Sequence, residues 1–173
     1  MEGIIHINIE EVIMFKKYLF IFLLSMVPII ELRGAIPYSV GFDLPSLPSF
    51  IVCVIGNMVP VPFIYWFARR VLEWGKDKRF IGKFFTWCLD KGERGGKKLM
   101  EKSGAGVYIA LLLFVGVPLP GTGAWTGTLA ASFLELDWKK SVIMVMLGVV
   151  MAGVIMYLGS KGLFGAIGFM TSR

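Results

Sequence analysis

The sequence predicts an all-α integral membrane protein, built as an inverted repeat of two re-entrant helical hairpins that each precede a transmembrane helix. Hydrophobic residues make up 56% of the 173 positions, more than is usual for a soluble domain. Four uncharged apolar runs divide the chain, at Tyr18–Ile30, Leu44–Ala68, Ser103–Leu134 and Ser141–Ser160. A membrane-spanning helix needs about 20 apolar residues. The second and fourth runs are long enough to be simple spans, whereas the first is too short and the third too long.

The N-terminal segment, residues 1–17, mixes Ile, Glu and Lys. Four of its apolar residues can share one helical face, namely Ile5, Ile9, Val12 and Ile13. This pattern predicts an amphipathic helix on the membrane surface, with a disordered leader as the alternative. A cleaved signal peptide is not expected, because no small-x-small cleavage site follows the apolar stretch after Lys16 and Lys17.

The first hairpin is expected at residues 28–48, whose opening reads Pro-Ile-Ile-Glu-Leu-Arg-Gly-Ala-Ile-Pro. The preceding apolar run, taken as a helix, covers about 20 Å, which is short of the roughly 30 Å of a bilayer core. Five helix-breaking residues then follow at a spacing that predicts no continuous helix: Gly34, Pro37, Gly41, Pro45 and Pro48. Irregular backbone at membrane depth is tolerated only against protein or a wet cavity, so a re-entrant hairpin fits.

A full span is predicted over Leu47–Trp74, with a kink where Asn57, Pro60 and Pro62 interrupt it. Asn57 is expected to form a helix–helix hydrogen bond rather than to belong to a site.

The segment 75–104 is predicted to be cytoplasmic and interfacial. Between Arg69 and Lys102 lie eleven Lys or Arg against five Asp or Glu, and basic loops stay on the cytoplasmic side. Apolar positions such as Phe80, Ile81, Phe84 and Trp87 predict a surface helix, which Gly92, Gly95 and Gly96 should break into a flexible basic linker. Membrane lipids are its expected contacts, and nucleic acid is not expected because the segment separates two hydrophobic halves.

A second hairpin is expected at residues 117–135, because Ser103–Leu134 as one straight helix would be about 48 Å long. Positions 118–127 read Pro-Leu-Pro-Gly-Thr-Gly-Ala-Trp-Thr-Gly, which requires a break with its tip near Gly121–Gly127. The last span, Ser141–Ser160, follows Trp138-Lys-Lys and carries a small-residue face for close helix packing, formed by Gly148, Ala152 and Gly153.

The two halves, about 15–74 and 105–160, are predicted to be one repeat used twice. A shift of 90 residues aligns Tyr18 with Tyr108 and Pro28 with Pro118. If each hairpin enters and leaves on one side, each half crosses the membrane once and both termini lie opposite the basic segment. Interrupted helices at matching places in an inverted repeat indicate a transporter's midplane site.

The candidate site centres on two charges, since a charge at membrane depth costs about 2.5–3.5 kcal/mol on insertion scales and usually has a function. Arg33 is predicted to bind an anionic group such as phosphate, and Glu31 to be a proton-coupling carboxylate. A structural ion pair, mutual or between hairpins, and a loop at head-group level are the alternatives.

In the second hairpin, backbone N–H groups and two threonine hydroxyls predict an anion-binding nest, with tight glycine packing as the alternative. Trp125 is a candidate for stacking, gating or interfacial anchoring. The substrate-binding candidates together are Glu31, Arg33, Gly34, Pro37, Pro118, Pro120, Gly121, Thr122, Gly123, Trp125, Thr126 and Gly127.

Motifs of known enzymes are missing from the sequence, which has no Ser/His/Asp set, metal-ligand cluster or Walker A pattern. No enzymatic activity, cofactor or metal is therefore expected. Cys53 and Cys88 suggest no disulfide, and the lone His6 is expected at the surface.

The segments 28–37 and 118–127 resemble those of the putative small multidrug export protein family, and the resemblance covers nearly the whole chain. In architecture the chain is also similar to the DedA/VTT superfamily, which has two re-entrant hairpins and bacterial members implicated in recycling undecaprenyl phosphate. The superfamily's Pro-Gly-Glu type and arginine-bearing motifs are only partly present, since both charges here lie in the first hairpin.

The resemblance implies an ion-coupled transporter in the plasma (inner) membrane of a prokaryote. It would move a lipid-linked phosphate or an amphipathic small molecule, coupled to H⁺ or Na⁺. The alternative is a non-transporting scaffold or assembly factor whose hairpins are packing devices. The sequence leaves open whether the protein forms a homo-oligomer.

Overall fold

The computed structural model describes residues 9–78 and 82–171, and every regular element within these ranges is an α-helix. The helices are α1 (Ile9–Met26), α2 (Glu31–Gly41), α3 (Ser46–Met58), α4 (Pro60–Lys76), α5 (Gly82–Ser103), α6 (Gly106–Gly116), α7 (Ala124–Phe133) and α8 (Trp138–Thr171). Two stretches are long and apolar enough to cross a membrane, Ser46–Lys76 in α3–α4 and Trp138–Leu163 in α8. The prediction of an all-helical chain with two candidate spans is confirmed.

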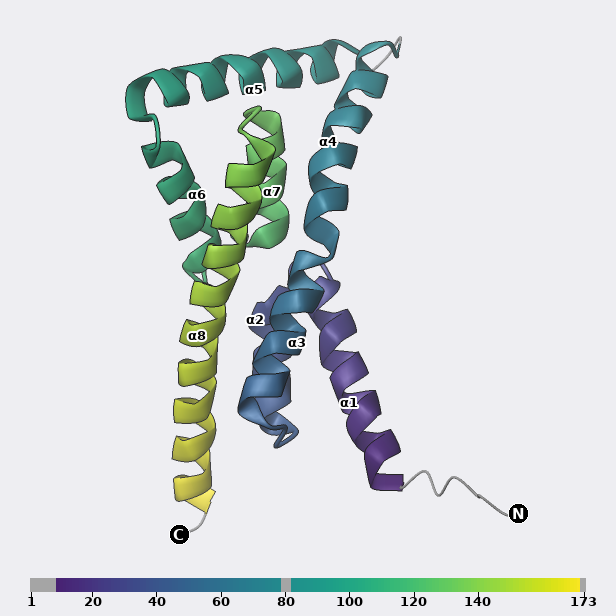
Figure 1. The fold of residues 1–173 in the computed structure, drawn as a ribbon, viewed down its shortest axis with the longest axis vertical. Helices are drawn as coiled ribbons and strands as arrows, with labels where there is room; N and C mark the ends of the chain where they lie inside the picture. Colours follow the sequence, from purple (N-terminus) through teal and green to yellow (C-terminus); the bar gives the residue numbers. More distant parts are fainter. Residues whose placement is uncertain (1–8, 79–81, 172–173) are drawn as a thin grey trace, which may run out of the picture.

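The two halves of the chain run along the molecule in opposite directions (Figure 1). Helix α1 runs from one end of the molecule to its middle, α2 turns back beside it, and α3–α4 then covers the full length. Helix α5 crosses the opposite end. From there α6 runs to the middle, α7 turns back, and α8 returns along the full length. The α1–α2 and α6–α7 connections therefore approach the middle from opposite ends.

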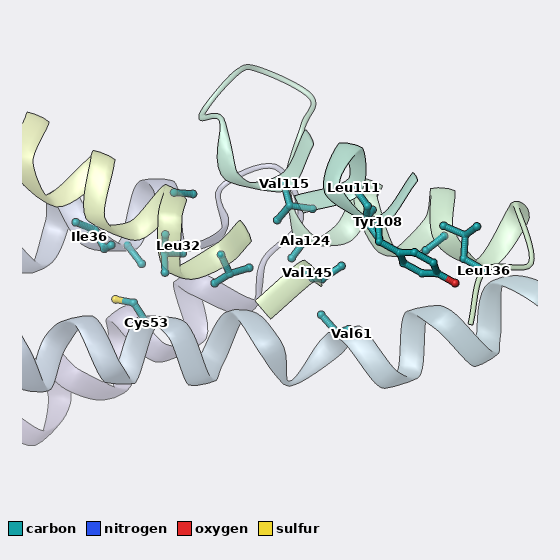
Figure 2. Close-up of a cluster of buried hydrophobic side chains, with 14 of the residues drawn as sticks. Leu32, Ile36, Cys53, Val61, Tyr108, Leu111, Val115, Ala124, Leu136 and Val145 are labelled. Atoms are coloured by element: carbon teal, nitrogen blue, oxygen red, sulfur yellow. The ribbon is translucent and has the colours of Figure 1, made fainter. Parts of the chain in front are cut away.

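The short returning helices interlock the two halves. Helix α2 packs against α8, and α7 packs against α4, so each lies on the long helix of the other half. Between them is a buried apolar cluster to which both halves contribute (Figure 2). Its members Leu32, Val61, Val115 and Val145 are each 1% exposed. This shared core fixes the α1–α2 connection against the α6–α7 connection.

Close glycine contacts recur at matching positions in the two halves. A Cβ atom on Gly56 of α3 would lie 2.6 Å from the carbonyl oxygen of Phe22 in α1. A Cβ atom on Gly148 of α8 would lie 2.8 Å from the carbonyl oxygen of Leu112 in α6. The glycines are 92 residues apart and the carbonyls 90 residues apart. In both halves, only glycine lets the full-length helix (α3–α4 or α8) approach the half-length helix (α1 or α6) so closely.

The turns that follow α2 and α7 share one backbone motif. The N–H of Leu44 donates to the carbonyl of Ser39, and that of Leu136 to the carbonyl of Ala131, both at 3.1 Å. The residue before each donor has a positive φ, 54° in the first turn and 53° in the second. These are the features of a Schellman-type helix end. Donors and acceptors are 92 residues apart, the same spacing as that between Gly56 and Gly148.

The first break lies earlier than predicted, and α2 is a continuous helix. Gly34 and Pro37 lie inside it, so the predicted break at these two residues was wrong, whereas no continuous helix runs on to Pro45 because α2 ends at Gly41. Proline inside a helix removes one backbone hydrogen bond. Packing of α2 against α1, α3 and α8 offsets that loss. The irregular backbone of the first break lies at residues 27–30, and a second turn follows α2 at residues 42–45.

The second break also lies earlier than predicted. Helix α7 begins at Ala124, so Trp125, Thr126 and Gly127 are helical rather than part of a tip. The irregular segment comprises residues 117–123, which contain both prolines and two of the three glycines. The residues of α7 after Gly123 include no proline, so a short packed helix can form there.

Helix α5 is continuous, which corrects the predicted flexible linker. It runs through Gly92, Gly95 and Gly96 to Ser103. Gly96 is buried, and a Cβ atom there would lie 2.8 Å from the carbonyl carbon of Leu134. Each glycine disfavours the helix by about 1 kcal/mol relative to alanine. Close packing on the turn after α7 compensates for part of that cost.

The N-terminal helix is a single element rather than a surface helix followed by a half-helix. Helix α1 begins at Ile9 and continues without a boundary at Tyr18. The predicted roles of Ile5 and His6, and of Phe80 and Ile81, fall outside the described residues.

Candidate functional site

The first turn of α2 lies in the middle of the molecule, against the break between α6 and α7. The core residue Leu32 holds this turn in place, because it is buried between the halves. Its neighbours Glu31 and Arg33 both reach across to the other half. Sequence reasoning singled out these two charges, and the structure supplies their partners.

The carboxylate of Glu31 binds the N-terminus of α7. Its Oε1 accepts a hydrogen bond from the backbone N–H of Trp125 at 3.0 Å, and its Oε2 from that of Ala124 at 3.2 Å. These are the first two residues of α7, whose N–H groups have no acceptor within their own helix. The residue is only 4% exposed. A negative charge is favourable at this end of a helix dipole, so Glu31 acts as a cap supplied by another element.

The guanidinium of Arg33 binds the carbonyls where α6 ends. Its Nη1 donates to the carbonyls of Leu119 and Thr122 at 2.5 Å, and its Nη2 to those of Val115 and Val117 at 3.0 and 3.1 Å. Carbonyls in the last turn of a helix have no intrahelical donor, and a cation is favourable there. Arg33 therefore fixes the whole course of the irregular segment 117–123.

Trp125 makes the reverse connection. Its indole Nε1 donates to the carbonyl of Met26, the last residue of α1, at 3.1 Å. The position 92 residues before Trp125 is Arg33, which binds the end of α6 in the other half. Each returning helix thus carries, at a corresponding position, a donor for the end of the opposite half-length helix.

Glu31 and Arg33 form no ion pair with each other, although both are described and lie in one helical turn. The predicted alternative was an ion pair, mutual or between hairpins; the two charges instead form hydrogen bonds with backbone groups of the other half. Both terminal nitrogens of Arg33 already serve carbonyls. An incoming anion would have to replace some of those contacts.

Of the groups predicted to form an anion-binding nest, the backbone N–H groups of Ala124 and Trp125 bind the carboxylate of Glu31, whereas the hydroxyl of Thr126 donates to the carbonyl of Gly123 at 3.4 Å. Gly123 has a φ of 149°, and a Cβ atom there would lie 2.7 Å from Cδ of Glu31. The hydroxyl of Thr122 donates within the break, to the carbonyls of Val117 and Leu119 at 3.0 and 2.9 Å. Glycine at 123 is therefore what allows the carboxylate to reach the helix end.

The remaining candidates divide into two groups. Pro118, Pro120 and Gly121 lie in the break that Arg33 binds, and Thr126 is exposed on α7. The other three lie apart from the two charges or serve packing. Pro37 lines a separate hollow with Tyr38, Gly41 and Phe42, Gly34 packs against Ile30, and Gly127 packs against Val115.

The first break is conformationally strained. Ile29 has a φ of 77° and Glu31 a φ of 51°, values that are uncommon for residues other than glycine. A left-handed β-branched residue is a true outlier, and such positions cost about 1–3 kcal/mol each. The side chain of Ile29 contributes little packing in return, because it is 97% exposed. The contacts of Glu31 and Arg33 are what hold this backbone in place.

Sequence reasoning missed a second polar connection between the halves. Arg69 of α4 pairs with Glu135 at 3.1 Å, and the hydroxyl of Tyr65 donates to the carbonyl of Leu136. The hydroxyl of Ser132 donates to the carbonyl of Tyr65 at 2.8 Å. No local sequence pattern points to this connection, because the partners lie about 70 residues apart.

Within residues 9–78 and 82–171, no three His, Cys, Asp or Glu side chains gather as metal ligands would. The thiol of Cys53 is free and buried in the apolar core.

A family model described as "Putative small multi-drug export protein" matches residues 31–155. The chain belongs to this family. No curated protein and no solved structure matches the chain. The resemblance of segments 28–37 and 118–127 to this export family is therefore confirmed, while the similarity to the DedA/VTT superfamily stays a prediction.

The matched region of the small multi-drug export family begins at Glu31 and ends within α8. It includes Arg33, the second break, α5 and both candidate spans except the last part of α8. Family membership and the two long apolar helices together indicate a membrane protein, and the family description indicates export.

Proposed function

We propose that the protein is an ion-coupled exporter of anionic amphiphiles, with lipid-linked phosphates as the leading substrate class. It would work as a multi-pass protein in the plasma membrane of a prokaryote. The observation that carries the proposal is the pair of opposite charges at the centre, each bound to a helix end of the other half. Charges within a membrane protein usually mark substrate or ion paths. The proposal involves no catalytic residue, cofactor or nucleic acid.

The proposed architecture is an inverted repeat with two re-entrant hairpins, α1–α2 and α6–α7. Helices α6 and α7 contain 11 and 10 residues, or about 16 Å and 15 Å, against a bilayer core of roughly 30 Å. The recurring glycine contacts and turns at spacings of 90 and 92 residues support one ancestral unit. The opposite directions of the two halves in Figure 1 support an axis in the membrane plane.

The proposed transport step exchanges the partners of Arg33. A phosphate-like group would take the planar fork of Arg33 from some of its four carbonyls, as arginine suits such oxygens. Protonation of Glu31 would remove its charge and weaken its hold on α7, which frees the Ala124 and Trp125 N–H groups for the anion. Release of the substrate and the proton on the other side would restore the present contacts. Coupling to Na⁺ at Glu31 is the variant.

Transport by the reconstituted full-length protein tests the proposal. Glu31→Gln should abolish the dependence of transport on a pH gradient while the protein stays folded. Arg33→Lys should slow transport roughly tenfold or more, because lysine keeps the charge but cannot replace the fork. Glu73→Gln and Arg70→Lys, at exposed positions of α4, are matched controls that should transport like the parent.

The alternative function is a non-transporting scaffold or assembly factor. A specific observation favours it: both charges already have complete structural roles in bonding backbone groups. If Glu31→Gln and Arg33→Lys lower only the thermal stability and leave transport or complementation unchanged, the scaffold is the correct assignment and the transport site is wrong.

A further inference from the structure

Helix α5 carries a basic pocket that the central site does not involve. Its lining residues are Trp87, Asp90, Lys91, Arg94, Gly95 and Lys98, around a volume of about 340 Å³. Lys91, Arg94 and Lys98 are all exposed. Three cations against one carboxylate leave the pocket positive, so it favours an anion.

An apolar groove of about 280 Å³ lies between α6 and α7. Its lining includes three small residues, Gly106 and Ala110 of α6 and Ala130 of α7, and Phe114 lines it further along α6. Ser103, the last residue of α5, also lines it. The groove therefore begins beneath α5 and extends along the half-length helix α6.

The basic pocket and the apolar groove adjoin. Gly95 lines the pocket, and a Cβ atom there would lie 3.4 Å from Cδ2 of Leu134. Leu134 in turn lines the groove. Helix α5 sits directly on this residue, because Gly96 meets its backbone. The basic pocket and the apolar groove are therefore neighbours, and the contact between Gly95 and Leu134 lies between them.

We propose that this combined site binds one anionic membrane phospholipid. The head-group phosphate lies against Arg94 and Lys98, and an acyl chain lies in the groove between α6 and α7. The charge selects an anionic head group, as basic juxtamembrane segments do. The groove favours a lipid over a free anion or an acidic peptide, because neither of these has an acyl chain to fill it. The inference does not depend on the transport proposal, since it uses none of the central residues.

Lipid binding by the purified full-length protein in non-ionic detergent tests the inference. Native mass spectrometry with dioleoylphosphatidylglycerol or dioleoylphosphatidylcholine gives the affinity for each. The parent should prefer phosphatidylglycerol. Arg94→Gln with Lys98→Gln should lower that affinity roughly 5- to 30-fold, from one to two lost surface cations, and leave phosphatidylcholine unchanged. Arg94→Lys with Lys98→Arg keeps the charges and should bind like the parent.

The groove has its own variant and control. Ala110→Phe should fill it and reduce phosphatidylglycerol binding, whereas Leu113→Phe, on the exposed side of α6, should not. If the Ala110→Phe variant does not fold, phosphatidylglycerol binding is measured instead with the Ala130→Val variant, in which the same groove is narrower. Unchanged binding in the glutamine variant overturns the inference. So does unchanged binding in the filled-groove variant, or displacement of the lipid by equimolar inorganic phosphate, since either would mean adsorption of a head group alone.

Discussion

Glu31 and Arg33 bind opposite ends of one interruption from a single helical turn. The carboxylate meets the N–H groups that open α7, and the guanidinium meets the carbonyls that close α6. Hydrogen bonds that involve a charged group contribute about 1.5–3 kcal/mol each, and the sign of each charge suits its helix end. This arrangement explains why the second break needs no charge of its own, because the first half supplies both signs.

The residue that makes room for the carboxylate is Gly123, and its replacement is the first prediction. Gly123→Ala would place a Cβ atom 2.7 Å from Cδ of Glu31 and force alanine into a φ of 149°. We expect a large fall in the thermal unfolding midpoint in detergent, together with loss of function.

Gly121→Ala is the matched control for that experiment. Gly121 also has a positive φ, 81°, but a Cβ atom there meets nothing within 4 Å. It should show only the strain of a left-handed alanine, about 1–2 kcal/mol. Equal effects of the two substitutions would mean that contact with Glu31 adds nothing.

At the scale of elements, packing decides which glycine- and proline-bearing segments are helical. Helix α2 contains Pro37 and α5 contains Gly92, Gly95 and Gly96, yet both are continuous. In each case the helix lies against other elements that require its backbone to come close. Local propensity is a weak prior that tertiary contacts override.

The second prediction compares two neighbouring glycines of α5, Gly95 and Gly96, to distinguish the effect of close packing from that of intrinsic helix propensity. Gly96→Ala should lower thermal stability and make α5 more susceptible to proteolysis, because its Cβ atom would strike the backbone of Leu134. Gly95→Ala should be neutral or stabilising by up to about 1 kcal/mol, since its Cβ atom would make only a 3.4 Å contact. The idea that α5 docks through Gly96 fails if the two variants have the same unfolding midpoint.

At the scale of the whole molecule, the beginning of α1 and the end of α8 lie at the same end of the molecule, and α5 lies at the opposite end (Figure 1). The exposed cations of α5 and of the end of α4 gather at that opposite end. From the positive-inside rule we expect α5 to lie in the cytoplasm and the other end of the molecule to lie outside.

Cysteine accessibility in intact cells checks this orientation, which is the third prediction. With Cys53 and Cys88 replaced by alanine, Lys91→Cys should react with a membrane-impermeant maleimide only after the cells are opened. Leu163→Cys, exposed near the far end of α8, should react from outside. Labelling of Lys91→Cys in intact cells would reverse the orientation. Protection of both positions in intact cells would contradict the expectation that the start of α1 and the end of α8 lie on the outer side of the membrane.

The sequence by itself determined the properties that depend on composition and on local backbone chemistry. Apolar content and run length predict a helical membrane protein with two long spans. Proline and glycine predict two breaks, and the rarity of charge in apolar runs singles out Glu31 and Arg33. These signals lie within a few residues of the features they predict, so one sequence is enough to find them.

Only the tertiary structure decided what those features bind. The partners of Glu31 and Arg33 are backbone groups 82 to 94 residues away, and a backbone carbonyl or N–H has no signature in the sequence. The continuity of α2 and α5 was likewise decided by contacts with distant elements, which outweigh local helix propensity. Which charge meets which helix end depends on how the two halves interlock, and that arrangement arises only when the whole core is packed.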